Sequence, residues 1–340
     1  MSKICILNTG GTIGMKATED GFKPIPGYLA AQMGNMAELG QSEMPAFEIH
    51  EYSPVIDSSN MDPAHWLQMA TDIHDKYDQF DGFVICHGTD TMAYSASALS
   101  FMLQGLNKSV ILTGAQLPLG EFRNDARENL KTAIMLAAHH HIPEVSLLFD
   151  ETLLRGNRST KVSATRFDAF ASPNYPPLGS VGTQIEVFQR RLRQPPAEQT
   201  LKVQKINPIE IATFRLFPGM SNEVLKNVLR QPLKALILES YGSGNGPAND
   251  PAFLDTIRQW SDAGTVIVSC TQCRHGSVTP SIYATGRAML KAGVISGRDM
   301  TVEAAITKLM FLFSCDLTVD EIKKKVQQDL AGELTEPEKA

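Results

Sequence analysis

The stretch KICILNTGGTIG, residues 3–14, decides the fold class of the first part of the chain. Its first residues, 3–8, are mostly apolar, which is typical of a strand that a parallel sheet buries on both faces. Gly10 and Gly11 then let the backbone turn sharply, and Thr12 presents a hydroxyl just beyond the strand. Because open α/β sheets bind ligands at the carboxyl ends of their strands, Thr12 is a candidate site residue.

A nicotinamide-binding site is one alternative for this glycine turn. Such a site has the pattern GxGxxG at the start of a helix, with an acidic residue about 20 positions later. Here the pattern is GGTIG, and residues 15–28, MKATEDGFKPIPGY, indicate a loop rather than a helix. The spacing therefore argues against a dinucleotide. Taken alone, Thr12 is equally compatible with an ordinary capping role.

A second stretch has the same organisation. Residues 82–92, GFVICHGTDTM, form an apolar run that ends in a glycine and then presents Thr89 and Asp90. Each polar residue alone is compatible with capping the helix that follows. Two strand ends that both carry a hydroxyl favour one shared site at the edge of the sheet.

Strand-like and helix-like segments alternate along the first part of the chain. This alternation predicts an α/β fold with helices on both faces of the sheet. The further strands are expected at 83–87, 110–113 and 145–149, and the helices at 62–77, 95–106 and 126–138.

The composition changes near residue 189. The stretch RRLRQPPAE, residues 190–198, is charged and contains a proline pair, which indicates a linker. We therefore expect an N-terminal α/β domain over 1–189, a linker over 190–207 and a C-terminal α/β domain over 208–340.

Strands and helices alternate again in the second half. Strands are expected at 233–238 and 265–269. Ser221 and Asp250 are expected to start helices, and Thr318 to cap the last helix. The charged tail over 333–340 is expected to fray.

The composition also limits the partners. The 340 residues include 31 Lys and Arg against 37 Asp and Glu, a net charge of −6. With no block of Lys or Arg, this mild acidity argues against nucleic acid or an anionic membrane as a partner. The five cysteines are scattered, as in a reducing compartment. The first residues lack the long apolar run of a secretory signal, so we expect a cytoplasmic protein.

Two groups of residues raise a metal or redox interpretation. Cys270 and Cys273 form a CxxC near His275, and residues 139–141 are three histidines. The CxxC has no second pair and follows an apolar run, so two reduced thiols at a strand end are the simpler interpretation. Histidines suit the C-terminus of a helix without a metal, and adjacent ones point in different directions. We expect neither a metal nor a cofactor.

Two further polar runs are uninformative when taken singly. Residues 57–60, DSSN, are compatible with a simple turn, and residues 155–161, RGNRSTK, with a solvated surface. They become candidate site segments only when they are considered together with the strand ends that carry Thr12 and Thr89.

Together these stretches resemble the asparaginase/glutaminase family. Residues 9–14 match its pattern T-G-G-T-I-G, and residues 82–92 match G-x-x-x-x-H-G-T-D-T-M. The likeness continues through 57–59, 113–115, Lys161 and 241–245, and so covers nearly the whole chain. The resemblance is to the bacterial type I, cytoplasmic members. It implies a larger N-terminal Rossmann-like (flavodoxin-like) sheet domain, a smaller C-terminal α/β domain, and hydrolysis of L-asparagine to L-aspartate and ammonia without a cofactor.

The resemblance assigns the catalytic roles. Thr12 is expected to be the nucleophile, and Thr89, Asp90 and Lys161 a second polar set. A threonine hydroxyl needs a base, and a lysine can act as one where its surroundings lower its pKa. Lys161 is expected to deprotonate Thr89 or a water, with Asp90 orienting it. Which hydroxyl attacks first stays open. The Thr89 N–H is the expected oxyanion donor.

The substrate is a zwitterion, so its two ends need opposite partners. The resemblance assigns Asp90 to the ammonium and Ser58 to the α-carboxylate. It also implies a homodimer, or a homotetramer built as a dimer of dimers, in which a neighbouring subunit completes the site. The remaining substrate-binding residues that it implies are Asp57, Ser59, Ala115 and, from the neighbour, Asn245.

The sequence departs from the family pattern in two places. In the expected lid, 14–28, Phe22 stands where many members have a catalytic tyrosine, and Tyr283 is the candidate replacement. The resemblance also suggests an effector site around Thr271, Gln272 and Cys273. Glu239 stands where that site expects an arginine, so we expect no effector response of the same form.

Three alternatives to an asparaginase stay open at this point. Glutamine is one methylene longer, and a pocket discriminates one methylene by only about 1–3 kcal/mol, so some glutaminase activity is expected. An amidotransferase subunit would carry an extra N-terminal domain, whereas the first strand here starts at Lys3. A non-catalytic amino-acid sensor is the third alternative, and the intact Thr12, Thr89, Asp90 and Lys161 argue against it.

Overall fold

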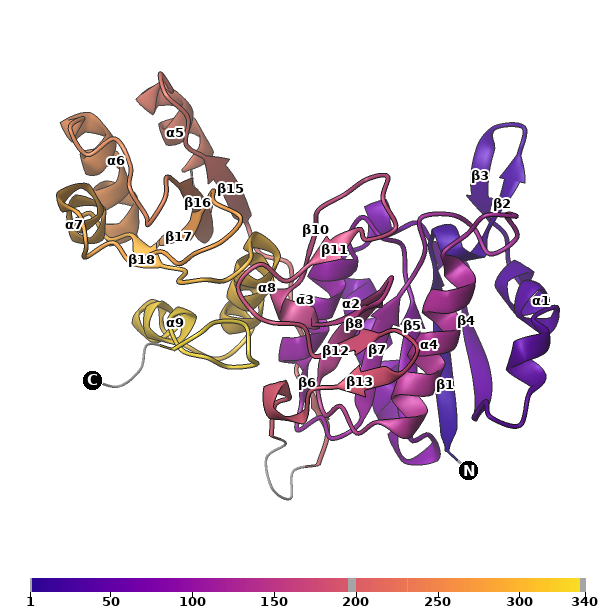
Figure 1. Cartoon of the computed structure of the whole chain (residues 1–340). Coiled ribbons are helices and arrows are strands. Elements are labelled where there is room, and N and C mark those ends of the chain that lie inside the picture. The colour runs from indigo at the N-terminus through magenta and orange to yellow at the C-terminus, as the bar shows by residue number, and fades with distance from the viewer. Residues whose placement is uncertain (1, 195–199, 231, 337–340) are drawn as a thin grey trace. The chain divides into compact units, whose positions relative to one another are not determined.

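The computed structural model describes residues 2–194, 200–230 and 232–336. The chain divides into two compact units, Met1–Gln204 and Lys205–Ala340 (Figure 1). Part of the expected linker, residues 195–199, lies outside the described residues, as does the end of the expected frayed tail, residues 337–340.

The first unit is built on an eight-stranded sheet with the order β13-β12-β9-β8-β7-β5-β1-β4. The run from β8 to β4 is parallel, and the strands on the other side of β8 pair antiparallel. The strands are β1 (Lys3–Gly10), β4 (Ala46–Ile56), β5 (Gly82–Cys86), β7 (Ser109–Thr113), β8 (Val145–Phe149), β9 (Thr152–Arg155), β12 (Gly179–Val181) and β13 (Ile185–Val187).

The four strands expected from apolar runs in this unit are all present. Every residue of β5, β7 and β8 is buried, as is β1 after its first residue. Full burial explains why these strands are apolar without alternation, because helices cover both faces of a parallel sheet.

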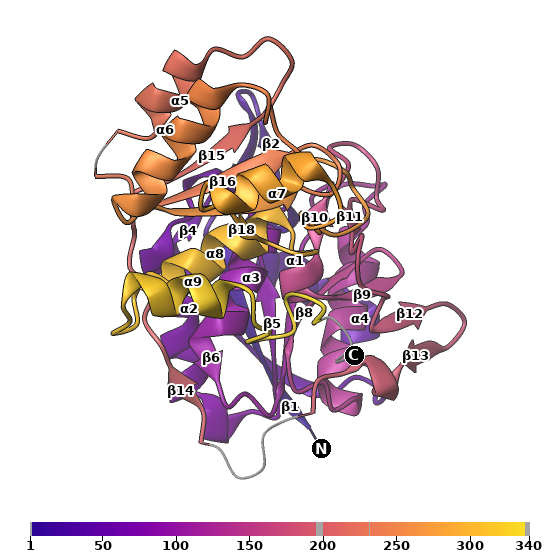
Figure 2. The ribbon, with the colours of Figure 1, turned by 90° about the vertical axis from the view of Figure 1, so that its left-hand side faces the viewer.

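Four α-helices pack on this sheet, which lies between α2 and α3 on one side and α4 on the other (Figure 2). Ile4, Ile6 and Val84 form one core with α1 and α4. Asp62 caps α2 through a capping box with His65, and a proline follows at the first helical position, as the sequence predicted. The helices are α1 (Tyr28–Gly34), α2 (Pro63–Asp75), α3 (Met92–Met102) and α4 (Ala126–His139).

Two local predictions for this unit are wrong. The helix expected over 95–106 starts earlier and ends at Met102, because β6 (Leu103–Gln104) leaves it to pair with β14 (Lys202–Val203). The loop expected over 15–28 contains a hairpin of β2 (Met15–Thr18) and β3 (Gly21–Pro24), with Gly21 in the left-handed region. A second short pair joins β10 (Thr160–Lys161) to β11 (Phe170–Ala171).

The second unit has a four-stranded parallel sheet with the order β15-β16-β17-β18. Its strands are β15 (Ile211–Arg215), β16 (Ala235–Ser240), β17 (Val266–Thr271) and β18 (Ile295–Ser296). Its helices are α5 (Asn222–Val228), α6 (Pro251–Asp262), α7 (Ala284–Lys291), α8 (Val302–Phe313) and α9 (Val319–Val326). Ser221, Asp250 and Thr318 cap α5, α6 and α9, as predicted.

The start of the C-terminal tail is ordered, contrary to the prediction that 333–340 frays. Glu333 is fully buried and pairs with Lys308, which is also fully buried. The Glu333 carboxylate also accepts hydrogen bonds from the N–H groups of Leu330 and Ala331. The charge of Glu333 therefore holds the tail against α8. Within the described residues, no helix is long and apolar enough to cross a membrane.

Candidate active site

Three loops of the first unit touch at the carboxyl edge of its sheet. They follow β1, β4 and β5 and carry Thr12, Ser58 and Thr89. A Cβ atom added to Gly11 would stand 2.3 Å from the Gly88 nitrogen, and one added to Gly88 would stand 2.4 Å from the Ser58 Oγ. Only glycine allows this approach, since Gly11 also has a φ of +85°. The glycines therefore bring the three polar loops into contact.

Thr89, Asp90 and Lys161 form a connected cluster. The Lys161 Nζ lies 2.7 Å from the Thr89 Oγ1 and 2.7 Å from the Asp90 Oδ1, and it donates to both. Lys161 reaches this place because β10 pairs with β11, which sets Lys161 opposite Phe170. Thr89 is buried, the Lys161 side chain is 21% exposed and the Asp90 side chain is 66% exposed. A ligand at this edge can therefore reach both the carboxylate and the ammonium.

Thr12 lies directly after the close contact of Gly11 with Gly88. It is the first residue of the short 3-10 helix Thr12–Gly14 and is partly exposed, whereas Ile13 and Gly14 are buried. Thr12 thus lies at the same sheet edge as the Lys161 cluster.

The run at 57–59 has two distinct functions in the structure. The Asp57 Oδ1 accepts from both the N–H and the hydroxyl of Ser59, at 2.9 Å each, and so caps a 3-10 turn. Ser58 is buried beside Gly88, and its carbonyl accepts from the Thr91 hydroxyl at 2.8 Å. Ser58 thus lies within the cluster of loops, while Asp57 and Ser59 shape the turn.

Ala115 and Gln116 form the loop after β7. Ala115 is buried, and the Gln116 side chain donates to the Arg166 carbonyl at 3.0 Å. The Thr89 hydroxyl lies 3.5 Å from the Gln116 Oε1. Gln116 was not among the residues predicted from the sequence, although it directly follows the 113–115 stretch of the family pattern. A hollow of about 580 Å³ opens beside Gln116 and is also lined by Leu117, Arg123 and residues 164–168.

Asp125, which directly precedes α4, fixes this loop and was also not predicted from the sequence. Its carboxylate accepts from the N–H groups of Gln116 and Leu117 at 2.9–3.0 Å. Burial raises the pKa of Asp125, although these N–H groups favour its charged form. No sequence signal marks such a partner, because an aspartate before a helix is an ordinary cap.

Asn245 and Tyr283 belong to the second unit. The Asn245 Oδ1 accepts a hydrogen bond from the Thr285 hydroxyl at 2.5 Å, and the Asn245 backbone closes a turn with Tyr241. Tyr283 precedes α7 and is 55% exposed. Phe22, the residue that Tyr283 was expected to replace, lies on β3 in the first unit.

The suggested effector segment is also in the second unit. The Gln272 amide donates to the carbonyls of Leu216 and Glu239, at 2.7 and 2.8 Å. The Thr271 hydroxyl accepts from the Cys273 N–H. The Glu239 carboxylate pairs with Arg215 at 2.9 Å, so the charge that departs from the family pattern is compensated within the unit.

The thiols of the CxxC differ in their surroundings. Cys270 is fully buried, and burial raises its pKa to about 12, whereas Cys273 is exposed. A buried thiol of this kind stays protonated and is a poor nucleophile and metal ligand. In residues 2–194, 200–230 and 232–336, no group of three or more His, Cys, Asp or Glu side chains could hold a metal ion.

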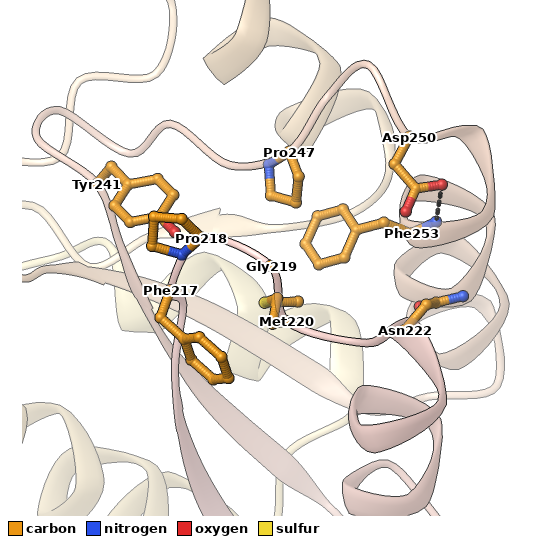
Figure 3. Close-up of a pocket in the computed structure, with 9 residues that line it drawn as sticks. All are labelled: Phe217, Pro218, Gly219, Met220, Asn222, Tyr241, Pro247, Asp250 and Phe253. Carbon is orange, nitrogen blue, oxygen red and sulfur yellow. Dashed lines mark hydrogen bonds between the residues drawn. The ribbon is translucent and has the colours of Figure 1, made fainter.

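A separate hollow of about 240 Å³ lies in the second unit. Figure 3 shows the rings of Tyr241, Pro218, Pro247 and Phe253 around it, with Met220 beneath. Asp250 stands at its rim, where its carboxylate accepts from the Phe253 N–H as the cap of α6. The hollow is apolar, and none of the predicted site residues lines it.

The fold and the cluster define a class of protein. A lysine that contacts a threonine hydroxyl and pairs with a carboxylate can move a proton, and enzymes that attack an acyl carbon with a side-chain hydroxyl need such a group beside the nucleophile. It stands at the carboxyl edge of a parallel sheet, where α/β proteins bind their ligands. This is an enzyme of the hydroxyl-nucleophile class.

Comparison with known proteins identifies the family. The family model described as asparaginase, N-terminal, matches residues 3–193, and the one described as glutaminase/asparaginase C-terminal domain matches residues 210–325. The chain belongs to the asparaginase/glutaminase family, which confirms the resemblance seen in the sequence.

Similar proteins can be aligned with this chain over nearly its whole length. L-asparaginase 1 of Escherichia coli K12 is 52% identical over 98% of both chains. The 60 kDa lysophospholipase of Mus musculus is 40% identical over 98% of this chain and 63% of its own length. The crystal structure of L-asparaginase I from Vibrio cholerae matches with a TM-score of 0.91 and 47% identity, over 98% of this chain and 99% of that one. The expected fold class is thereby confirmed.

Proposed function

We propose that this protein is an L-asparaginase, which hydrolyses L-asparagine to L-aspartate and ammonia. The observation that carries the proposal is the contact of the Lys161 Nζ with both Thr89 and Asp90, at 2.7 Å each. The contact of Gly11 with Gly88 sets Thr12 at the same sheet edge. Family membership and the similarity to L-asparaginase 1 of Escherichia coli support the substrate.

In the proposed reaction, the Thr12 hydroxyl attacks the side-chain amide carbon of asparagine. Its proton passes to Lys161, directly or through Thr89, and then to the leaving nitrogen, so that ammonia departs. Water then attacks the acyl-enzyme, which releases aspartate and restores the Thr12 hydroxyl. The Thr89 N–H stabilises the negative charge that develops on the amide oxygen in both steps.

The ends of the substrate are proposed to bind groups of opposite charge. Asp90 is exposed enough to meet the ammonium of the substrate while it still contacts Lys161. Ser58 is proposed to bind the α-carboxylate, from its place beside Gly88. Asp57, Ser59 and Ala115 are proposed to shape the pocket. A glutamine substrate is only one methylene longer, so slower glutaminase activity is expected.

The second unit is proposed to complete the site in an oligomer. Asn245 of a neighbouring subunit would contact the substrate in a homodimer or homotetramer, and Tyr283 would supply the hydroxyl that Phe22 lacks. We also propose that the linker 190–207 separates the N-terminal catalytic domain, 1–189, from the C-terminal domain, 208–340. The protein is proposed to act in the cytoplasm, and its five free cysteines support a reducing compartment.

Ammonia release tests the proposal. We expect release from L-asparagine at millimolar concentration and slower release from L-glutamine, with a hyperbolic dependence on asparagine. Thr12→Ala should lose at least about 10³-fold in kcat. Thr12→Ser is the matched control, since it keeps a hydroxyl and should retain measurable turnover.

Two outcomes would contradict the proposal. Full activity in a folded Thr12→Ala protein would exclude the assigned nucleophile. Tight binding of asparagine by calorimetry, without any ammonia release, would instead indicate an amino-acid sensor.

A further inference from the structure

His87 is a buried titratable residue that the proposed reaction does not use. It follows β5 directly, has no exposed surface and precedes the Gly88–Thr89 peptide. Its Nδ1 lies 2.7 Å from the Gly88 carbonyl oxygen, and its Nε2 lies 2.8 Å from the Ser95 Oγ. The Ser95 Oγ also accepts from the Trp66 Nε1 at 2.9 Å. A hydrogen-bonded chain thus joins α2 and α3 to the end of β5.

The donor and the acceptor of each of these three hydrogen bonds can be assigned. A carbonyl oxygen can only accept, so the His87 Nδ1 must carry a proton toward Gly88. An indole N–H can only donate, so the Ser95 oxygen accepts from Trp66 and its own hydroxyl is free to donate to the Nε2. Burial lowers the pKa of His87 to about 4, so the ring is neutral and carries this single proton.

The same bond fixes the plane of the peptide that follows. In a trans peptide the C=O of one residue and the N–H of the next point in opposite directions. The only cis bond among the described residues is Ser53–Pro54, so Gly88–Thr89 is trans. Because His87 holds the Gly88 oxygen, the Thr89 N–H is directed away from the buried ring. The contact of Gly88 with Gly11 and Ser58 leaves little room for the peptide to turn.

We propose that His87 is a positioning residue for catalysis. Its neutral ring, whose single proton Ser95 and Trp66 keep on the Nδ1, holds the Gly88–Thr89 peptide so that the Thr89 N–H meets the oxyanion formed from the substrate amide. This inference rests on the proposed function, in which Thr89 supplies that donor. His87 itself does not act as an acid or a base, because both ring nitrogens are engaged and no part of the side chain is exposed.

Two substitutions separate positioning from packing. The amide nitrogen of an asparagine can occupy the place of the Nδ1, because both are bonded to Cγ, whereas a glutamine amide reaches only the place of the Nε2. His87→Asn should therefore keep the bond to Gly88, and His87→Gln should lose it. We expect kcat within about tenfold of wild type for His87→Asn and about 10²–10³-fold lower for His87→Gln, since one oxyanion donor contributes about that much. KM should change little in either variant.

A control shows what a purely structural loss would do. Tyr52 is buried in the same unit, and its hydroxyl donates to Asp72 at 2.6 Å. Tyr52→Phe removes one buried hydrogen bond without touching the site, so it should lower thermal stability and leave kcat unchanged. Ser95→Ala adds a milder test in case His87→Gln does not fold. It removes the donor to the Nε2, and kcat should fall by about tenfold.

Nitrogen-15 NMR of ring-labelled histidine reads the tautomer directly. We expect His87 to be neutral at pH 7 with its proton on the Nδ1, in the wild type and in Ser95→Ala alike, because the Gly88 carbonyl can only accept from that nitrogen. An Nε2–H tautomer in the wild type, equal kcat values in the two His87 variants, or a change confined to KM would overturn the inference. If the wild type releases no ammonia at all, the proposed function fails. The tautomer measurement still stands in that case, so the two failures are distinguishable.

Discussion

Each unit of this protein contains a lysine paired with a carboxylate, and the two pairs have opposite surroundings. In the first unit Lys161 lies 2.7 Å from Asp90, with side chains 21% and 66% exposed. In the second unit Lys308 lies 2.5 Å from Glu333, and neither side chain is exposed. Similar chemical groups at similar distances thus meet very different amounts of solvent.

The difference lies in what else each lysine contacts. The Lys308 Nζ also donates to the carbonyls of Val326 and Gln328, so fixed backbone groups use its remaining capacity. The Lys161 Nζ donates instead to the Thr89 hydroxyl, a group that can exchange a proton. The pair in the second unit is therefore suited to hold a chain segment. The pair in the first unit is suited to proton transfer at an open edge.

The largest expected effect separates the two lysines by activity. In the proposed reaction Lys161 takes the threonine proton, so Lys161→Met should lower kcat by about 10⁴-fold, as the loss of a triad member does. Its free energy of unfolding should fall by less than about 1 kcal/mol, since water can solvate the exposed Asp90. Steady-state ammonia release and urea unfolding at one fixed protein concentration measure the two effects.

The opposite result would contradict the assignment of a catalytic role to the Lys161–Asp90 pair and a structural role to the Lys308–Glu333 pair. If Lys161→Met unfolds several kilocalories per mole more easily and keeps its activity, then the first pair is structural as well. Lys161→Arg is the informative control, because it keeps the charge beside Asp90 but is a much weaker base. It should be as stable as wild type and nearly inactive.

The next effect is one of stability in the second unit. Lys308→Met leaves the Glu333 charge buried without its partner, which should cost about 3–5 kcal/mol of unfolding free energy. Replacing both residues, as Lys308→Met with Glu333→Leu, should restore most of the loss, because an apolar pair fills the same space. Urea unfolding of the single and double variants tests this. A stable double variant with strongly reduced kcat would show that the buried pair has a chemical role after all.

This comparison also shows what the sequence could predict. Thr12 and Thr89 follow buried apolar strands, and the rule that parallel strands present their ligands at one edge was enough to group them. Lys161 could be included only through the resemblance, because it lies on the two-residue strand β10, far along the chain from Thr89. Pairing with β11 positions it, and such a short pair has no periodic signal.

The errors have the same physical origin. The tail at 333–340 was expected to fray because it is charged, yet Glu333 is buried against Lys308. A lysine inside the mostly apolar α8 was the available signal, since a buried lysine requires a partner. The chain of Trp66, Ser95 and His87 was not foreseen, because its members come from three elements. Local patterns predict elements, whereas buried polar contacts depend on how the elements pack.

The smallest expected effect is the energetic coupling within the exposed pair. A double-mutant cycle of Lys161→Met and Asp90→Asn should give an interaction energy of at most about 1 kcal/mol in urea unfolding. It should shrink further between 0.05 M and 1 M salt, because the Debye length falls from above 10 Å to about 3 Å. The corresponding cycle of Lys308→Met and Glu333→Leu should give several kilocalories per mole and little salt dependence, since ions do not enter the buried site. Equal coupling energies, or an equal response to salt, would mean that solvent exposure does not distinguish the two pairs.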